Sequence, residues 1–114
     1  MWNMVAGPYS FGANSEADRQ GNLDALNAAA LALFEAGHMP IIGVNMALPV
    51  IRVAGTERYG EIMMPLSLAL AERCDAVLRI GGESPGADDE VARFRERGLP
   101  VYFALADIPA AKAS

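Results

Sequence analysis

The chain has 114 residues, of which 53% are apolar and 20% are charged, and its formal net charge is −5. This length fits one domain with a continuous core, and the composition excludes a disordered chain. The negative charge and the lack of a lysine and arginine stripe argue against a nucleic acid polymer as a partner, whereas a small anionic ligand stays possible.

Cysteine content and the apolar stretches suggest where the protein works. With the single cysteine Cys74 and no metal-ligand spacing, we expect no disulfide, no metal and no cofactor. Residues 1–8 do not resemble a signal peptide, and the longest largely apolar stretch, 25–34, is too short to span a bilayer. We therefore expect a cytoplasmic protein that does not bind membranes. The high apolar fraction also predicts helix faces buried between copies, as in a homo-oligomer.

The first part of the chain predicts a strand, a loop and a long helix. The strand covers residues 2–6 and is stopped by Gly7 and Pro8. Ser15 is suited to cap the helix, and Gly37 to end it in a left-handed conformation. Its buried stripe is predicted to consist of Leu23, Leu26, Ala30 and Leu33.

The middle of the chain is harder to interpret. Residues 39–44 predict a second strand that is buried on both faces. Residues 45–60 follow neither period clearly, which predicts a long irregular loop that is functional or mobile. A helix is expected over 61–73, where Pro65 is acceptable only in the first turn.

The last part continues the alternation of strand and helix. A third strand is expected over 75–80, a helix over 86–97 that ends at Gly98, and a fourth strand over 99–104. We expect one domain over residues 1–106 and a tail over 107–114, either a short helix or disordered.

This alternation predicts an α/β fold, namely a three-layer flavodoxin-like or Rossmann-like domain with four or five parallel strands. Right-handed crossovers place all strand-to-helix loops at one edge of the sheet, where ligands of open α/β sheets bind. Residues 7–14, 45–59 and 81–90 are therefore expected to meet there.

The segment 81–90 carries most of the chemistry. Glycines let the backbone approach a ligand closely, and the helix start at Gly86 and Ala87 presents free N–H groups. Ser84 can cap this helix or bind a phosphate or hydroxyl group, and Glu90 lies about one turn into it. Acidic residues also suit the first turn of any helix, so Glu90 needs no functional role to be explained.

Three pieces of the chain follow a combined pattern. They are Ala6-Gly7-Pro8 after the first strand, Cys74-Asp75-Ala76-Val77 at the third, and the segment from Ser84 to Glu90, which has the form Ser-x-Gly-x-x-x-Glu. Together they resemble the nucleoside 2-deoxyribosyltransferase superfamily. The superfamily includes deoxynucleoside 5′-monophosphate N-glycosidases and short domains of unknown function. The resemblance extends from Met4 to Phe103.

The resemblance implies a nucleoside or nucleotide as the small-molecule substrate and Glu90 as the catalytic nucleophile. Glu90 would attack the anomeric carbon, the base would leave, and water or another base would resolve the glycosyl ester. Ser84 and the amides near Gly86 would hold the 5′-hydroxyl or phosphate. The candidate substrate-binding residues are Gly7, Pro8, Tyr9, Gly81, Gly82, Ser84, Gly86 and Ala87.

Two positions depart from the family pattern. Met4 stands where the family usually has a tyrosine, and Ser67 where it has an aspartate that handles the proton of the leaving base. Tyr9, Glu61 and Glu83 are nearby substitutes. Three functions therefore remain open: an N-glycosidase or deoxyribosyltransferase, a nucleotide-binding domain without catalysis, and a structural or assembly domain.

Overall fold

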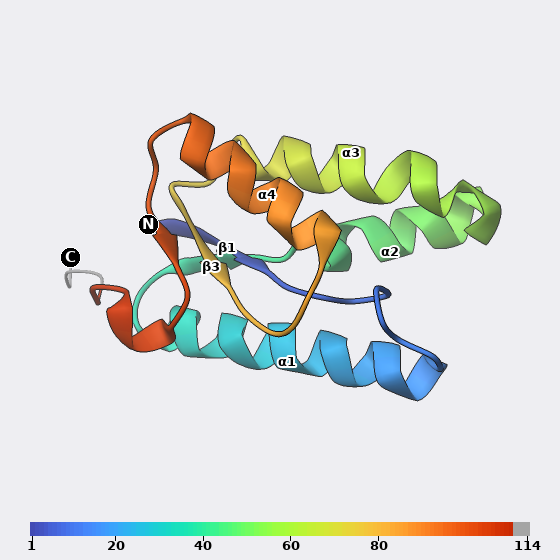
Figure 1. Cartoon of the computed structure of the whole chain (residues 1–114), viewed down its shortest axis with the longest axis horizontal. Coiled ribbons are helices and arrows are strands. Elements are labelled where there is room, and N and C mark those ends of the chain that lie inside the picture. The colour runs from blue at the N-terminus through green and yellow to red at the C-terminus, as the bar shows by residue number, and fades with distance from the viewer. Residues whose placement is uncertain (111–114) are drawn as a thin grey trace.

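The sheet has four parallel strands in the order β2–β1–β3–β4, in a computed structural model that describes residues 1–110. Its strands are β1 (Trp2–Ala6), β2 (Met39–Ile41), β3 (Ala76–Arg79) and β4 (Val101–Tyr102). Helix α1 (Glu16–Glu35) covers one face, and α3 (Tyr59–Ala71) and α4 (Pro85–Glu96) cover the other (Figure 1). The predicted three-layer α/β fold is confirmed.

The remaining elements are α2 (Gly43–Ala54) and two short 3₁₀ helices, η1 (Thr56–Arg58) and η2 (Leu105–Asp107). Helix α2 runs beside α3 (Figure 1). The start of the predicted tail, residue 107, belongs to η2, and residues 111–114 lie outside the described part of the chain.

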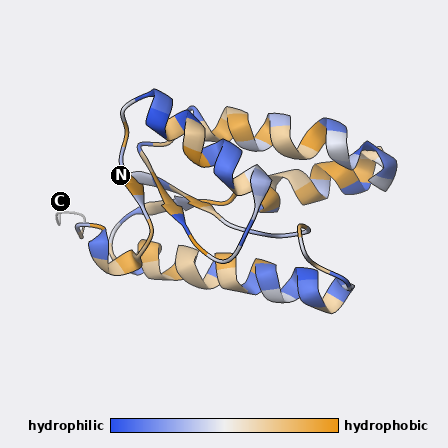
Figure 2. Cartoon of the chain, in the orientation of Figure 1, coloured by the Kyte–Doolittle hydropathy of each residue, from blue (hydrophilic) through white to orange (hydrophobic). Residues whose placement is uncertain are grey.

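Helix α1 is bounded as its sequence predicts. The Asp18 N–H donates to Ser15 Oγ (3.1 Å), and the Asn14 N–H donates to Asp18 Oδ2 (3.0 Å). Gly37 follows the helix with a φ of +92°. The polar residues of α1 gather in its first half, which projects beyond the strands, whereas Leu26 and Leu33 are buried (Figure 2).

The core lies on both faces of the sheet because the side chains of a strand alternate between its faces. Met4 and Ala6 of β1 pack in one cluster with Phe94 of α4. Val5 packs in a second cluster with Leu26 of α1. A third cluster joins α2 to α3 and extends the core beyond the sheet.

The expectation of a long irregular loop over 45–60 is wrong. The second strand ends at Ile41, and α2 starts at Gly43 and occupies most of the predicted loop. Both Pro49 of α2 and Pro65 of α3 lie inside their helices, so the expectation that Pro65 fits only a first turn is also wrong.

The strand order places a switch point between β1 and β3. From β1 the chain crosses to β2 on one side and then returns to β3 on the other, so the two connections diverge at the carboxyl ends of β1 and β3. Open α/β sheets bind ligands in the crevice that forms there. None of the helices described in residues 1–110 is both long and apolar enough to cross a membrane.

Candidate functional site

A hollow of about 200 Å³ lies at the switch point, which we call the inner hollow. The loop after β1, helix α3 and the start of α4 form its walls. It is lined by Gly7, Tyr9, Ser10, Phe11, Val44, Tyr59, Gly60, Met63, Met64, Ser67, Ser84, Gly86, Ala87 and Glu90.

The start of α4 is fixed by its own sequence. Ser84 is the N-cap, and its hydroxyl oxygen accepts a hydrogen bond from the N–H of Ala87 (3.2 Å). Pro85 suits the first helical position because that residue needs no hydrogen-bond donor. The helix therefore begins at the wall of the inner hollow, and Glu90 lies just over one turn from that end.

Glu90 is buried at this wall, with only 8% of its surface exposed. Burial raises the pKa of its carboxyl group to about 8, an effect that Arg79 opposes and Asp89 reinforces. At neutral pH the group therefore holds its proton most of the time. A buried carboxyl group with a shifted pKa beside a hollow is typical of functional sites.

Arg79, at the end of β3, organises the loop behind Glu90. Its guanidinium donates to the carbonyl oxygens of Gly82 (2.8 Å) and Ile80 and to Asp88 Oδ1 (3.2 Å). These bonds tie the loop after β3 to the first turn of α4. Arg79 is absent from the residues predicted for the site, although an arginine at the carboxyl end of a buried strand is a usable signal.

Five of the eight predicted substrate-binding residues line the inner hollow, and three do not. The three are Pro8, Gly81 and Gly82. Gly81 has a φ of +78°, and a β-carbon there would lie 2.7 Å from Pro8 Cδ. Gly81 thus lets the loops after β1 and β3 pack together, which is a structural reason for a glycine at this position.

The two departures from the family pattern differ in position. Met4 is fully buried in the core and does not line the inner hollow, whereas Ser67 does. Of the suggested substitutes, Tyr9 lines the inner hollow. Glu61 pairs with Arg58 (2.9 Å), and Glu83 lines two other hollows and not the inner one. Among the described lining residues, Glu90 is the only carboxylate.

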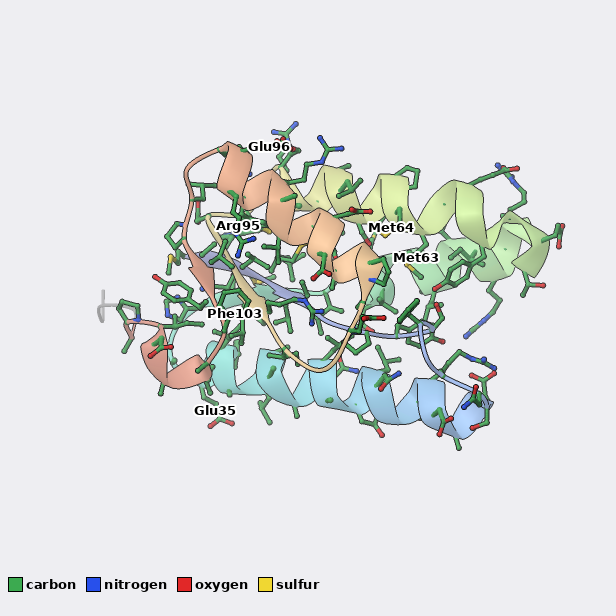
Figure 3. All side chains as sticks on the ribbon, in the orientation of Figure 1. Glu35, Met63, Met64, Arg95, Glu96 and Phe103 are labelled. Atoms are coloured by element: carbon green, nitrogen blue, oxygen red, sulfur yellow. The ribbon has the colours of Figure 1, made fainter. Side chains whose placement is uncertain are left out.

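Tyr59 falls in the long loop predicted over 45–60, and this part of the prediction is wrong. Tyr59 begins α3 and lines the inner hollow, and its hydroxyl group shares a hydrogen bond with Ser10 Oγ (3.1 Å). Met63 and Met64 also line the inner hollow and lie where α3 faces the start of α4 (Figure 3). A helix predicted to start two residues earlier, at 59, would have revealed the role of Tyr59.

No metal centre forms within residues 1–110, where no three histidine, cysteine or acidic side chains come together. Comparisons with protein-family models, curated proteins and solved structures return no match for this chain. The fold and the hollow define the protein as a three-layer α/β domain with a hollow of about 200 Å³ at its switch point.

Proposed function

We propose that the protein cleaves, or transfers at, the N-glycosidic bond of a nucleoside or nucleotide, with Glu90 as the group that attacks the sugar. The observation that carries this proposal is the position of the Glu90 carboxyl group, buried at the wall of the inner hollow near the start of α4. The motif from Ser84 to Glu90, which resembles that of the nucleoside 2-deoxyribosyltransferase superfamily, forms this wall.

The inner hollow offers groups that suit each part of such a substrate. At the start of α4, Pro85 has no N–H and those of Ala87 and Asp88 are bonded to Ser84. The Gly86 N–H and the Ser84 hydroxyl are therefore the groups that suit a 5′-hydroxyl or phosphate. Tyr9 and Phe11 line the same hollow and provide flat faces for a base. A volume of about 200 Å³ suits a sugar ring with part of its base, the rest extending outside.

The proposed reaction has two steps. First, the Glu90 carboxylate forms an ester with the anomeric carbon while the C–N bond breaks and its electron pair leaves with the base. The base takes a proton from water, or from the Tyr9 hydroxyl group, which then regains a proton from water. Then water, or a second base, attacks the anomeric carbon and frees the carboxylate, with the proton of that nucleophile passing to solvent.

The first step needs Glu90 to be ionised. Since burial raises its pKa to about 8, the ionised fraction grows as the pH rises through this value. Positive charge that develops on the sugar ring favours the carboxylate in the transition state. We therefore expect kcat/KM to increase from neutral pH to about pH 9.

A nucleotide-binding domain without catalysis is the second candidate. It is favoured by Met4, a buried core residue where the family usually has a tyrosine, and by Ser67, which offers no carboxylic acid to the leaving base. A structural or assembly domain without a ligand is a weaker candidate, because it gives the inner hollow and its buried carboxyl group no role.

Base release tests the first candidate. Purified protein is incubated with 2′-deoxynucleosides and their 5′-monophosphates, and free base is measured by chromatography. The matched variants are Glu90→Gln and Glu96→Gln, since Glu96 is an exposed acid at the opposite end of α4 (Figure 3). We expect release by the wild type and Glu96→Gln and a loss of at least about a hundredfold in Glu90→Gln.

Thermal shift separates the other two candidates if no base is released. A monophosphate at about a hundred times its dissociation constant stabilises a binding domain by about 2.7 kcal/mol. Such a shift without base release supports the nucleotide-binding domain, and no shift with any substrate supports the structural one.

Exposed apolar side chains on α1 and α2 favour association of the protein with a second copy of itself. Met46, Val50 and Val53 are exposed along one side of α2, and Leu31 and Phe34 are exposed on α1. The two helices are connected where the Asn45 side-chain amide donates to Asn27 Oδ1 (2.7 Å). We propose that a second copy of the chain covers these side chains, and that the protein works in the cytoplasm.

A further inference from the structure

A second hollow, of about 670 Å³, opens beside the inner one, between the start of α1 and the end of α2, and we call it the outer hollow. Its apolar side is formed by Leu48 and Ile51 of α2. Arg19, Arg52 and Thr56 also line it and are more exposed than Ile51, so they lie toward its rim. In Figure 1 this is the end of the molecule where α2 and the start of α1 project beyond the strands.

The two hollows are neighbours because Tyr9, Ser10 and Tyr59 line both of them. The hydrogen bond between Ser10 Oγ and the Tyr59 hydroxyl (3.1 Å) therefore lies at their boundary. The outer hollow is therefore within reach of a ligand that occupies the inner one.

The outer hollow is lined by two guanidinium groups, those of Arg19 and Arg52, and by one carboxylate, that of Glu16. A guanidinium group donates only, so Arg19 and Arg52 select ligand atoms that accept. The guanidinium of Arg19 is partly occupied by Glu16 (3.0 Å). Arg52 is not in any of the ion pairs found among the described residues. Burial, with Glu16 and Tyr59 adding to it, raises the pKa of Tyr9, which keeps this hydroxyl group protonated.

We propose that the outer hollow binds the base of the substrate and selects bases that present carbonyl oxygens at the edge away from the sugar. This inference rests on the proposed function, since it assigns the substrate class of the same site. The apolar side formed by Leu48 and Ile51 fits the flat face of a ring, and Arg52 fits its edge. A 6-oxopurine presents two neighbouring acceptors to an arginine, whereas a 6-aminopurine presents an acceptor beside a donor.

Binding of free bases tests this selection without using catalysis. Dissociation constants are measured by titration calorimetry for hypoxanthine against adenine and for uracil against cytosine. We expect the oxo base to bind about tenfold or more tightly than the amino base in at least one pair. A preference in the first pair would identify a purine site, and a preference in the second a pyrimidine site.

Matched variants assign the preference to Arg52. Arg52→Met should abolish it and Arg52→Lys should weaken it, because lysine keeps the charge but loses the planar fork. Arg58→Met should keep it, since Arg58 is a nearby arginine that pairs with Glu61 and does not line the outer hollow. Arg52 is exposed on α2, so its substitution leaves the core intact.

Three results would overturn the inference: equal affinity within both pairs, no binding of any of the four bases, or a preference that survives in Arg52→Met. Glu90→Gln separates this inference from the proposed function. If Glu90→Gln keeps the base preference while neither it nor the wild type releases base, the proposed function fails and the base site stands. If the wild type releases base but shows no preference among the free bases, the proposed base site fails and the proposed function stands.

Discussion

At the scale of single residues, the carboxyl group of Glu90 makes stability depend on pH. Its pKa is about 8 in the folded chain, against about 4.5 for an exposed glutamate, so the folded state holds a proton that the unfolded state has lost between these values. The resulting stabilisation is complete below the lower value and disappears as the pH rises through the upper one.

The free energy of unfolding should therefore fall by a few kcal/mol between about pH 5 and pH 9, at about 1.4 kcal/mol for each unit of pKa shift. Glu90→Gln should be nearly insensitive to pH over this range, because the amide does not ionise. Urea unfolding at both ends of the range measures the difference. If the free energy of unfolding fell equally with pH in the wild type and in Glu90→Gln, the carboxyl group would not be buried as described.

Asn3 in β1 is fully buried, and its side-chain atoms Oδ1 and Nδ2 have no hydrogen-bond partner among the described residues. A buried polar group without a partner costs about 1–3 kcal/mol. Asn3→Val should therefore raise the melting temperature, and Asn3→Asp should lower it strongly. A stable wild type with a less stable Asn3→Val variant would mean that the amide makes a compensating interaction.

At the scale of elements, the sequence predicts best where local signals are strong. Both α1 and α4 have a serine N-cap and end just before a glycine of positive φ, and both are placed within about one residue of their observed bounds. Capping depends on neighbours in the chain, so it can be recognised without the fold.

Helix α2 was missed because Pro49 lies inside it. The helical spacing of Val44, Ala47, Leu48 and Ile51 is present in the sequence, but an internal proline usually ends a helix. Here Pro49 leaves the carbonyl of Asn45 without its helical donor. Both residues are exposed, so water can take the place of that donor.

The candidate site was predicted only in part, because the sequence did not predict helix α2. Glu90, Ser84 and Tyr9 follow strands, and the topology alone brings them to one edge of the sheet. Ser67 and Tyr59 belong to α3, whose position depends on its packing against α2. Helix α3 was predicted over 61–73 and Ser67 was named, but α2 was missing, so the packing that brings Ser67 and Tyr59 to the inner hollow could not be predicted.

The contact between α2 and α3 is close at Gly43. A β-carbon at this position would lie 2.1 Å from Ser67 Oγ and 2.8 Å from Ser67 Cβ. Gly43→Ala should therefore destabilise the protein by about 1–3 kcal/mol and distort the inner hollow beside Ser67. Thermal unfolding measures the loss.

Gly21→Ala is the matched control, because a β-carbon on this α1 glycine would meet nothing within 4 Å. It should stabilise the protein by about 0.5–1 kcal/mol, since alanine favours a helix more than glycine does. A Gly43→Ala variant as stable as Gly21→Ala would contradict the close contact between α2 and α3.

At the scale of the whole molecule, helix α2 carries apolar side chains that are exposed and lie outside the core. Val53 is 91% exposed on α2, which lies beside α3 and away from α1 over most of its length (Figure 1). Exposed apolar side chains along a helix favour association with another surface.

We expect the protein to sediment with at least twice the mass of one chain at micromolar concentration. Val50→Lys should shift it toward a single chain, because a charge would be buried in the contact. Analytical ultracentrifugation measures both. A wild type that sediments as one chain would contradict the proposed self-association and leave the fold unaffected.

The most direct measurement of the Glu90 mechanism is the mass of the protein during turnover. After rapid acid quenching with a substrate that releases base, the peptide that carries Glu90 should gain the mass of one deoxyribosyl group or its 5′-phosphate, and Glu90→Gln should gain none. Base release that continues at full rate in Glu90→Gln, without modification of this peptide, would contradict the role of Glu90 as the nucleophile.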